Sequence, residues 1–351
     1  AMDNSSQRKI LRVSPACEIP QLAGQITPAL VGDGPTLGFG EITSESAPHY
    51  AAVVVGTSGS SGASKEVALT ATALISSARA SHKFIGAKPG QTWSLLLPLT
   101  HIAAVNVIVR SIELGTLPID LRNYEGEYPK VDYTSIVPTQ LFRALNGDVR
   151  LLNHLKSAKT VLVGGAALSQ SLRNQAELAG IKVITTYGMT ETCGGCVYDG
   201  EVLDGVEVEI RNGKINIRGP ILASSISLDA GWYETSDLGE IVDEKLFVLG
   251  RADDVIISGG ENLSLHAVEE SLSKAFPDIQ SAAFAIEDPQ WGHSLQIAIV
   301  GEVSDELISN HLEKQLGAFA KPKGIHHLAS LPLLGIGKVD RKALAKGISH
   351  E

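Results

Sequence analysis

The sequence has few cysteines and no long hydrophobic run. Its 351 residues include three cysteines, Cys17, Cys193 and Cys196. A small, odd number of cysteines in a long chain argues against a disulfide framework and suits a reducing compartment. No apolar run approaches the roughly 20 residues of a membrane-spanning helix, and no signal-peptide pattern is visible. We therefore expect a cytoplasmic protein.

Positive charge is also scarce. The chain has 29 Lys and Arg residues against 39 Asp and Glu residues, so its net charge is −10. This excess of negative charge disfavours nucleic acid or an anionic membrane surface as a partner. The hydrophobic fraction of 44% and the length are sufficient for two domains with ample cores.

Cys193 and Cys196 are separated by two glycines, which is the spacing of redox motifs. No second Cys/His pair stands nearby in the sequence. We therefore do not expect redox chemistry or metal binding at these cysteines.

The most informative stretch is a hydrophobic run followed by a Gly/Ser loop. Val53-Val54-Val55 predicts a buried strand. The residues of the loop that could bind a ligand are Thr57, Ser58, Gly59, Ser60, Ser61, Gly62 and Lys65. Backbone N–H groups in such a loop can form an anion nest, with hydroxyls as further donors. The alternative is a flexible linker, but the preceding strand favours a polyphosphate site. The loop is not a Walker A loop, which requires Gly-Lys-Ser/Thr.

Strands and helices are expected to alternate over most of the first 200 residues, after an irregular segment at 1–50. The predicted elements are a helix at 67–85, a strand from Trp93 that runs into Pro98 and then His101, a helix at 102–115, a strand at 160–163, a helix at 169–179 and a strand at 182–187. This alternation indicates a mainly parallel sheet, in which ligands gather at the carboxyl ends of the strands. The polar segments that follow these strands could therefore line one crevice.

From about residue 200 the pattern changes. Residues 206–210 and 214–217 alternate with period two around a short turn, which predicts a hairpin, and short strands continue to about 250. The elements expected beyond it are a helix at 264–275, strands at 281–286 and 295–300, and a helix at 304–318. We expect an α/β chain with a large domain, 1–252, that has mainly parallel sheet layers and a small β-rich segment. A small, mobile α+β domain, 253–351, would follow it.

Six stretches resemble, in order, motifs of the adenylate-forming superfamily, which includes acyl-CoA synthetases, adenylation domains of peptide synthetases and luciferases. They are the glycine loop at 57–65, Tyr187-Gly-Met-Thr-Glu191, Gly213-Lys-Ile-Asn-Ile-Arg-Gly-Pro220, Thr235-Ser-Asp237-Leu-Gly239, the hinge motif at 250–262 and Gly337-Lys338-Val-Asp-Arg341. Ser61 and Ser64 stand where the superfamily has Thr and Pro. The region before the glycine loop is shortened to about fifty residues, and the hinge motif continues as Ser264-Leu265-His-Ala where a Pro and a Glu are usual.

The resemblance implies a two-step reaction that uses ATP, Mg²⁺ and coenzyme A. A carboxylate attacks the α-phosphate of ATP to give an acyl-adenylate and pyrophosphate, and a thiol then displaces AMP. Phosphoryl-type transfer mainly needs positioning and charge neutralisation. The implied contacts are the glycine loop with the phosphates, Thr190 with the α-phosphate, Glu191 with Mg²⁺, Asp237 and Arg251 with the ribose, and Gly165, Ala166, Tyr187 and Gly188 around the nucleotide. Without the motifs, Glu191 would be a solvated loop carboxylate, and Asp237 and Arg251 surface charges.

The resemblance also assigns residues of the small domain. Lys338 would reach the substrate carboxylate and the α-phosphate during adenylation, although an exposed lysine on a loop is ordinary. Asp253 would be the hinge about which the domain rotates, with a simple turn aspartate as the alternative. Gly259, Gly260 and Glu261 would face coenzyme A in the second step.

One further pattern bears on the acid. Leu97-Pro98-Leu99-Thr100-His101, with Arg110 nine residues later, resembles the 2-succinylbenzoate–CoA ligases of menaquinone biosynthesis. A helix-borne Arg could bind the ring carboxylate of that substrate, which must not react; the alternative is an arginine that reaches solvent. The acyl-pocket residues implied are His101, Asn106, Arg110, Gly164, Gly188 and Met189.

Other functions stay open at this point. The chain could be a different aryl or fatty acid–CoA ligase, or a free-standing amino-acid adenylation enzyme. A binding module of another class, with ATP or acyl binding but reduced catalysis, would fit the shortened amino-terminal region. The expected partners are the small-molecule acid, ATP and coenzyme A, and a homo-oligomer is an open alternative.

Overall fold

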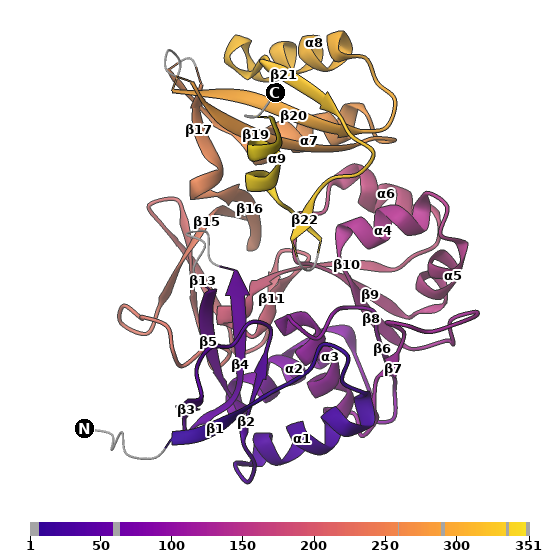
Figure 1. Cartoon of the computed structure of the whole chain (residues 1–351), viewed down its shortest axis with the longest axis vertical. Helices are drawn as coiled ribbons and strands as arrows, with labels where there is room; N and C mark the ends of the chain where they lie inside the picture. Colours follow the sequence, from indigo (N-terminus) through magenta and orange to yellow (C-terminus); the bar gives the residue numbers. More distant parts are fainter. Residues whose placement is uncertain (1–6, 59–63, 259, 289–291, 335–336, 349–351) are drawn as a thin grey trace. The chain divides into compact units, whose positions relative to one another are not determined.

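The computed structural model of the chain describes residues 7–58, 64–258, 260–288, 292–334 and 337–348 (Figure 1). The chain divides into two compact units. The first comprises Ala1–Ala167, Ala176–Glu209 and Asn216–Glu234, and the second comprises Leu168–Gln175, Ile210–Ile215 and Thr235–Glu351. Mixed sheets and helices make up the chain, as expected for the α/β class. Within the described ranges, no helix combines the length and hydrophobicity that crossing a membrane requires.

The first sheet has the strand order β3-β1-β2-β4-β5. Its strands are β1 (Gln7–Arg12), β2 (Thr36–Phe39), β3 (Ser46–Pro48), β4 (Ala51–Ser58) and β5 (Ser64–Thr70). Strands β1, β2 and β4 are parallel neighbours, whereas β3 and β5 lie antiparallel at the two edges. The glycine loop therefore connects the two strands of a hairpin.

The expectation that residues 1–50 are irregular is wrong. Besides the first strands, this segment contains the helix α1 (Ile19–Val31). The helix buries residues at helical spacing: Ile19, Leu22, Ile26 and Ala29. Gly24 and Pro28 lie inside it, and both are poor helix formers. They weaken the local signal, which is overridden by burial of the apolar face.

The helix predicted at 67–85 begins later than expected. Residues 64–70 form β5, and α2 (Ala71–Ile85) follows with Thr70 as its cap. Val67 and Leu69 lie opposite Val55 and Val53 in the hairpin. Pairing with β4 buries these hydrophobic residues, so the segment remains extended until the cap.

The second sheet has the strand order β12-β11-β10-β9-β8-β6-β7. Its strands are β6 (Trp93–Leu95), β7 (Ile119–Asp120), β8 (Tyr133–Ile136), β9 (Thr160–Val163), β10 (Val183–Met189), β11 (Gly194–Tyr198) and β12 (Glu201–Val202). The five strands from β10 to β7 are parallel, and β11 and β12 are antiparallel additions. This arrangement confirms the mainly parallel sheet. β6 is the strand predicted to begin at Trp93 and run into Pro98; it ends at Leu95, before this proline, which has no N–H for a strand hydrogen bond.

The helices associated with this part of the chain are α3 (Ile102–Glu113), α4 (Pro138–Leu145), α5 (Val149–Ser157) and α6 (Gln170–Leu178). A further sheet has the order β13-β14-β15-β16, with β13 (Glu207–Arg211), β14 (Lys214–Arg218), β15 (Tyr233–Val242) and β16 (Lys245–Arg251). Asn212 and Gly213 connect β13 to β14, both with positive φ. Such a turn suits a two-residue hairpin, as the sequence predicted.

The carboxyl-terminal elements form an α+β arrangement within the second unit. The sheet order is β18-β17-β20-β19, with β21 paired to β20. The elements are β17 (Val255–Ser258), β18 (Glu261–Ser264), α7 (Leu265–Ala275), β19 (Gln280–Asp288), β20 (Gly292–Val300), α8 (Asp305–Leu316), β21 (Gly324–His327), β22 (Leu333–Leu334), β23 (Lys338–Val339) and α9 (Arg341–Ile348). The helices predicted at 264–275 and 304–318 and the two strands after residue 280 are confirmed.

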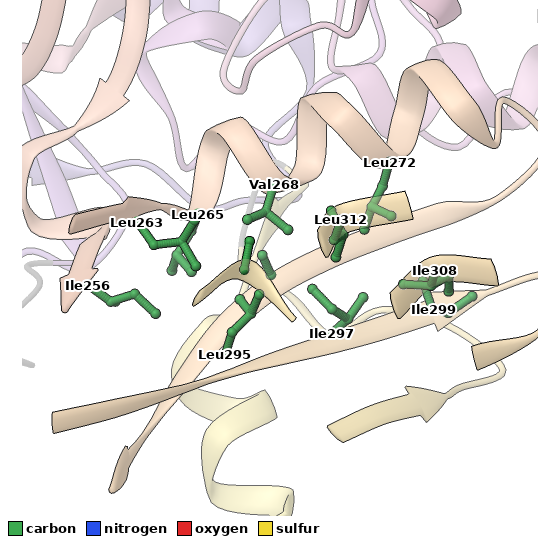
Figure 2. Packing of buried hydrophobic residues seen from close by; sticks show 12 residues of the cluster. Ile256, Leu263, Leu265, Val268, Leu272, Leu295, Ile297, Ile299, Ile308 and Leu312 are labelled. Atoms are coloured by element: carbon green, nitrogen blue, oxygen red, sulfur yellow. The ribbon is translucent and has the colours of Figure 1, made fainter. Parts of the chain in front are cut away.

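The sheet of this unit is covered on both faces. Alternate β20 residues Leu295, Ile297 and Ile299 pack with residues of α7 and α8, such as Val268 and Leu312 (Figure 2). On the other face, Leu344 of α9 packs with Phe284 and Ala298. Two-residue alternation along the strands places these sets on opposite faces. The packed helix α9 follows directly after the hairpin that carries Lys338.

Candidate functional site

The glycine loop starts and ends in the β4–β5 hairpin. Gly59, Ser60, Ser61 and Gly62 lie outside the described residues, and only the backbone of Ser58 is described. At the base of the loop, Thr57 lies opposite Lys65, and its Oγ1 donates a hydrogen bond to Lys65 O at 3.1 Å. The two ends of the loop are thus held together by strand pairing.

Lys65 also contacts the second motif. Its Nζ lies 3.1 Å from Oε1 of Glu191, which is 126 residues further along the chain. The Glu191 side chain is 15% exposed and that of Lys65 is 52% exposed, so the lysine is the more solvated partner. The Glu191 carbonyl accepts a hydrogen bond from the Ala223 N–H at 2.8 Å. The structure therefore brings the glycine-loop lysine and the Tyr187–Glu191 motif together, although they lie on different sheets.

Thr190 and Glu191 lie in a short turn, η1 (Thr190–Thr192), after β10. Thr192 is fully buried and shapes this turn. Its Oγ1 accepts from the Met189 N–H at 2.9 Å and donates to Gly194 O at 2.8 Å. Thr192 was not among the residues predicted from the sequence. The available signal was a hydroxyl side chain directly after the Thr-Glu pair, because such side chains bond to nearby backbone groups in turns.

Two glycines lie at the ends of the neighbouring parallel strands β9 and β10, where backbones approach closely. A Cβ on Gly164 would lie less than 3.0 Å from Thr186 Oγ1, and one on Gly188 would lie less than 3.0 Å from Gly194 O. Glycine is needed at both positions because any side chain would clash. The other candidates at this edge of the sheet are at least partly exposed: Gly165, Ala166, Tyr187 and Met189.

The predicted acyl-pocket residues His101, Asn106 and Arg110 lie at the start of α3 and along it. His101 is the cap residue and is half-buried. Asn106 is buried, and its Nδ2 donates to Cys193 O at 2.7 Å. This hydrogen bond ties α3 to the segment that follows Glu191.

Arg110 is 4% exposed. Its guanidinium donates to Tyr198 OH at 3.1 Å and lies over the Trp93 ring, 5.1 Å from the centroid. It also approaches Ser135 Oγ at 3.5 Å. These contacts are with neutral groups; among the described residues, its Nε has no hydrogen-bond partner and no carboxylate pairs with it. Burying a charge without an opposite charge is costly, so the surroundings of Arg110 favour an anionic group.

The buried surroundings of Arg110 also affect the pKa of His82 in α2. Desolvation by burial, and then the charge of Arg110, lower the pKa of His82 to about 4. Its ring lies near Trp93, with 6.1 Å between the ring centroids. His82 is therefore neutral at pH 7, and Arg110 carries the positive charge of this cluster.

Asp237 and Arg251, the predicted ribose ligands, lie opposite each other on β15 and β16. Arg251 Nη1 is 3.9 Å from Asp237 Oδ1. Arg251 also pairs bidentately with the predicted hinge residue Asp253, with Nε–Oδ1 2.7 Å and Nη2–Oδ2 3.1 Å. Hydrogen bonds from Arg251 lower the pKa of Asp253. The second unit thus brings the two ribose candidates and the hinge candidate together.

Lys338 is exposed at the start of β23, which pairs with β22. Three residues later, Arg341 anchors the start of α9, with Nη2 2.8 Å from Glu269 Oε1 and Nε donating to Ala283 O at 2.8 Å. From the sequence, Arg341 was predicted only as part of a motif, with no role of its own. Of the predicted coenzyme A residues, Gly259 lies outside the described residues, whereas Gly260 has a φ of 87° and Glu261 is exposed.

The three cysteines are free and buried. Burial raises the pKa of the Cys193 thiol and raises that of the Cys196 thiol to about 12. Thiols with raised pKa values are poor nucleophiles and poor metal ligands. Across the described ranges, no group of three or more His, Cys, Asp and Glu side chains is arranged to hold a metal.

Comparison with known proteins matches residues 16–221 to the family model described as AMP-binding enzyme. The chain is 38% identical to a Mycobacterium tuberculosis protein named probable 2-succinylbenzoate–CoA ligase, over 86% of this chain and 85% of that protein. It is 29% identical to the Escherichia coli 2-succinylbenzoate–CoA ligase, over 84% of this chain and 68% of that protein.

Solved structures are also similar to this chain. A variant of E. coli MenE with bound OSB-AMS superposes with a TM-score of 0.76 at 26% identity, covering 98% of this chain and 82% of that one. ATP-bound MatB from Rhodopseudomonas palustris shares the fold, with a TM-score of 0.73 at 22% identity over 85% of this chain and 68% of that one. The chain belongs to the AMP-binding enzyme family.

Proposed function

We propose that the chain is an ATP-dependent ligase that converts 2-succinylbenzoate to its CoA thioester through an acyl-adenylate, a step of menaquinone biosynthesis. Membership of the AMP-binding enzyme family supports the adenylate chemistry. The names of the relatives, which match most of the chain, support the acid. The observation in this chain that carries the choice of acid is the buried Arg110, which no described carboxylate neutralises.

The chemistry of the acid explains why such an arginine is useful. 2-Succinylbenzoate has one carboxylate to be activated and a second, on the ring, that must remain unreacted. A guanidinium offers a planar fork of donors that matches a carboxylate. In this proposal Arg110 binds the ring carboxylate, and His101, Asn106, Gly164, Gly188 and Met189 line the rest of the acyl pocket.

The nucleotide contacts follow from the motifs. Donors of the glycine loop and Lys65 hold the β- and γ-phosphates, and Thr190 hydrogen-bonds the α-phosphate. Asp237 accepts from the ribose hydroxyls and Arg251 donates to them. Gly165, Ala166, Tyr187 and Gly188 surround the adenine side. The Lys65–Glu191 contact supports this assignment because it brings the two phosphate motifs to one place.

Glu191 suits Mg²⁺ as a ligand. Its carboxylate is a hard oxygen donor beside the phosphate-loop lysine, and Mg²⁺ is commonly held by one or two carboxylates together with substrate phosphates and water. When bound, Mg²⁺ supplies positive charge that offsets the charge of the phosphates. The protein contributes the fixed position of Glu191, which the Ala223 hydrogen bond supports.

The small domain of this proposal, residues 253–351, supplies Lys338. Its charge offsets the repulsion as the substrate carboxylate approaches the α-phosphate. Rotation about Asp253 would then withdraw Lys338 and present Gly259, Gly260 and Glu261 to coenzyme A for the second step. We also propose that the enzyme works in the cytoplasm, which the free, buried cysteines support.

A substrate screen tests the function. The purified chain with Mg-ATP should release pyrophosphate with 2-succinylbenzoate and much less with benzoate, which lacks the succinyl carboxylate, or with a fatty acid. Adding coenzyme A should give AMP and the thioester. Turnover with a fatty acid or an amino acid, but not with 2-succinylbenzoate, would contradict the assignment of the acid.

A further inference from the structure

Glu66, the residue after the phosphate-loop lysine, is held by a turn at residues 40–44. Its Oε1 accepts hydrogen bonds from the Thr43 N–H at 2.6 Å, the Thr43 hydroxyl at 2.9 Å and the Ser44 N–H at 3.1 Å. Burial alone would raise the pKa of Glu66, but hydrogen bonds from Ser44 and Thr43 lower it to about 2. The carboxylate therefore stays charged throughout the physiological range and holds the turn.

The same turn packs against the base of the glycine loop. A Cβ on Gly56, directly before Thr57, would lie less than 3.0 Å from Glu41 O. A Cβ on Gly40 would lie 3.0 Å from both Gly56 O and Thr100 O. The turn thus touches the strand that enters the loop as well as the segment before His101.

The alternation of side chains along β5 relates the direction of Lys65 to the position of Glu66 on this turn. Consecutive residues of a strand point to opposite faces, and Gly56 and Thr57 lie opposite Glu66 and Lys65 in the hairpin. Binding of Glu66 to the turn on one face therefore directs Lys65 to the other, where it meets Glu191 at 3.1 Å. A slip of one residue would exchange the two faces.

We propose that Glu66 is a positioning residue that fixes the register of β5 on the 40–44 turn and so directs Lys65 toward the phosphates of ATP. The proposal rests on the nucleotide site described under the proposed function. It adds a residue outside the motifs of the family to the phosphate site. It also gives the first fifty residues a specific part in that site.

The test compares binding of Mg-ATP and of AMP by titration calorimetry. Glu66→Ala should weaken the binding of Mg-ATP by about 10-fold or more, since one charge-assisted hydrogen bond is lost or misplaced. It should change the affinity for AMP by no more than about twofold, because AMP has no β- or γ-phosphate for Lys65 to bind. Glu66→Gln keeps an acceptor oxygen for the turn and should recover part of the affinity for Mg-ATP. Glu45→Ala is the matched control, because Glu45 pairs with Arg12 and is exposed.

The outcomes separate the proposals. Equal weakening of Mg-ATP and AMP by a folded Glu66→Gln variant would mean that Glu66 only stabilises the fold and would overturn its positioning role. Unchanged affinity for Mg-ATP in Glu66→Ala or, if that variant does not fold, in Glu66→Gln would also overturn it. If the wild-type chain binds no Mg-ATP, the nucleotide site itself fails, and the role of Glu66 fails with it.

Discussion

In the proposed function, the choice of substrate depends on Arg110. Replacing it by Ala should raise the KM for 2-succinylbenzoate by about 10- to 100-fold, because a hydrogen bond to a charged group contributes about 1.5–3 kcal/mol. The KM for ATP should change little, since Arg110 contacts Tyr198, Ser135 and Trp93 rather than a phosphate motif. Steady-state kinetics with each substrate varied in turn measure both values.

Arg110→Lys gives the matched comparison. It keeps the charge but loses the planar fork, so its KM for the acid should fall between those of the wild type and Arg110→Ala. Thermal melting shows whether each variant is folded. If the KM for the acid is unchanged in folded Arg110→Ala, the ring carboxylate is held elsewhere.

His82 makes a pH-dependent contribution to stability. Its pKa in the folded chain is about 4, against an ordinary value of 6.5. The unfolded chain therefore takes up a proton first as the pH falls, so this contribution to stability is complete above about pH 6.5 and is lost between 6.5 and 4. The difference between these two pKa values corresponds to at most about 3 kcal/mol of unfolding free energy.

Urea unfolding at pH 7 and pH 5 measures this effect. The loss of unfolding free energy on acidification should be smaller in His82→Gln than in the wild type. It should not vanish, because burial also lowers the pKa of His154, which remains. An equal loss in both proteins would show that His82 is not the titrating group.

At the scale of elements, the β10–β11 connection depends on close backbone contact. Gly188→Ala should destabilise the chain by about 1–3 kcal/mol, because the new methyl group meets the Gly194 carbonyl and no side chain can move aside. Gly24→Ala in α1 is the contrasting control. No atom of the residues that the structure describes lies within 4 Å of a Cβ at Gly24, so this change should stabilise the chain by about 0.5–1 kcal/mol. Denaturant titration gives both values, and similar effects of the two changes would refute the close contact.

Helices and strands could be predicted where the local sequence pattern agrees with the burial in the structure. A few adjacent residues were enough to predict the helices α3 and α7, the β13–β14 turn and the loop motif at the end of β10. The predictions failed for α1 and β5. In α1 the helix formers are interrupted by Gly24 and Pro28, and in β5 the outcome depends on pairing with Val53 and Val55 of β4.

Across the whole molecule, the motifs predicted most of the residues of the candidate site but not the contacts that hold those residues in place. The Lys65–Glu191 pair joins residues 126 positions apart, and no local pattern reveals such a pair. The neutral partners of Arg110 and the hydrogen bonds that Glu66 accepts from Thr43 and Ser44 also depend on distant segments that fold against one another. Spacing on a helix could place Arg110 but could not show that it is buried with no acidic partner among the described residues.

The proposed activity is formation of a thioester through an acyl-adenylate. Its most direct test measures the two half-reactions separately in the wild type and in Lys338→Ala. The wild type should release pyrophosphate with 2-succinylbenzoate and Mg-ATP alone, and should convert preformed acyl-adenylate and coenzyme A to the thioester. Lys338→Ala should lose the first reaction by about 100- to 1000-fold and retain the second. If a folded Lys338→Ala slows both half-reactions equally, or if the wild type forms no adenylate, the proposed two-step reaction with Lys338 in its first step is contradicted.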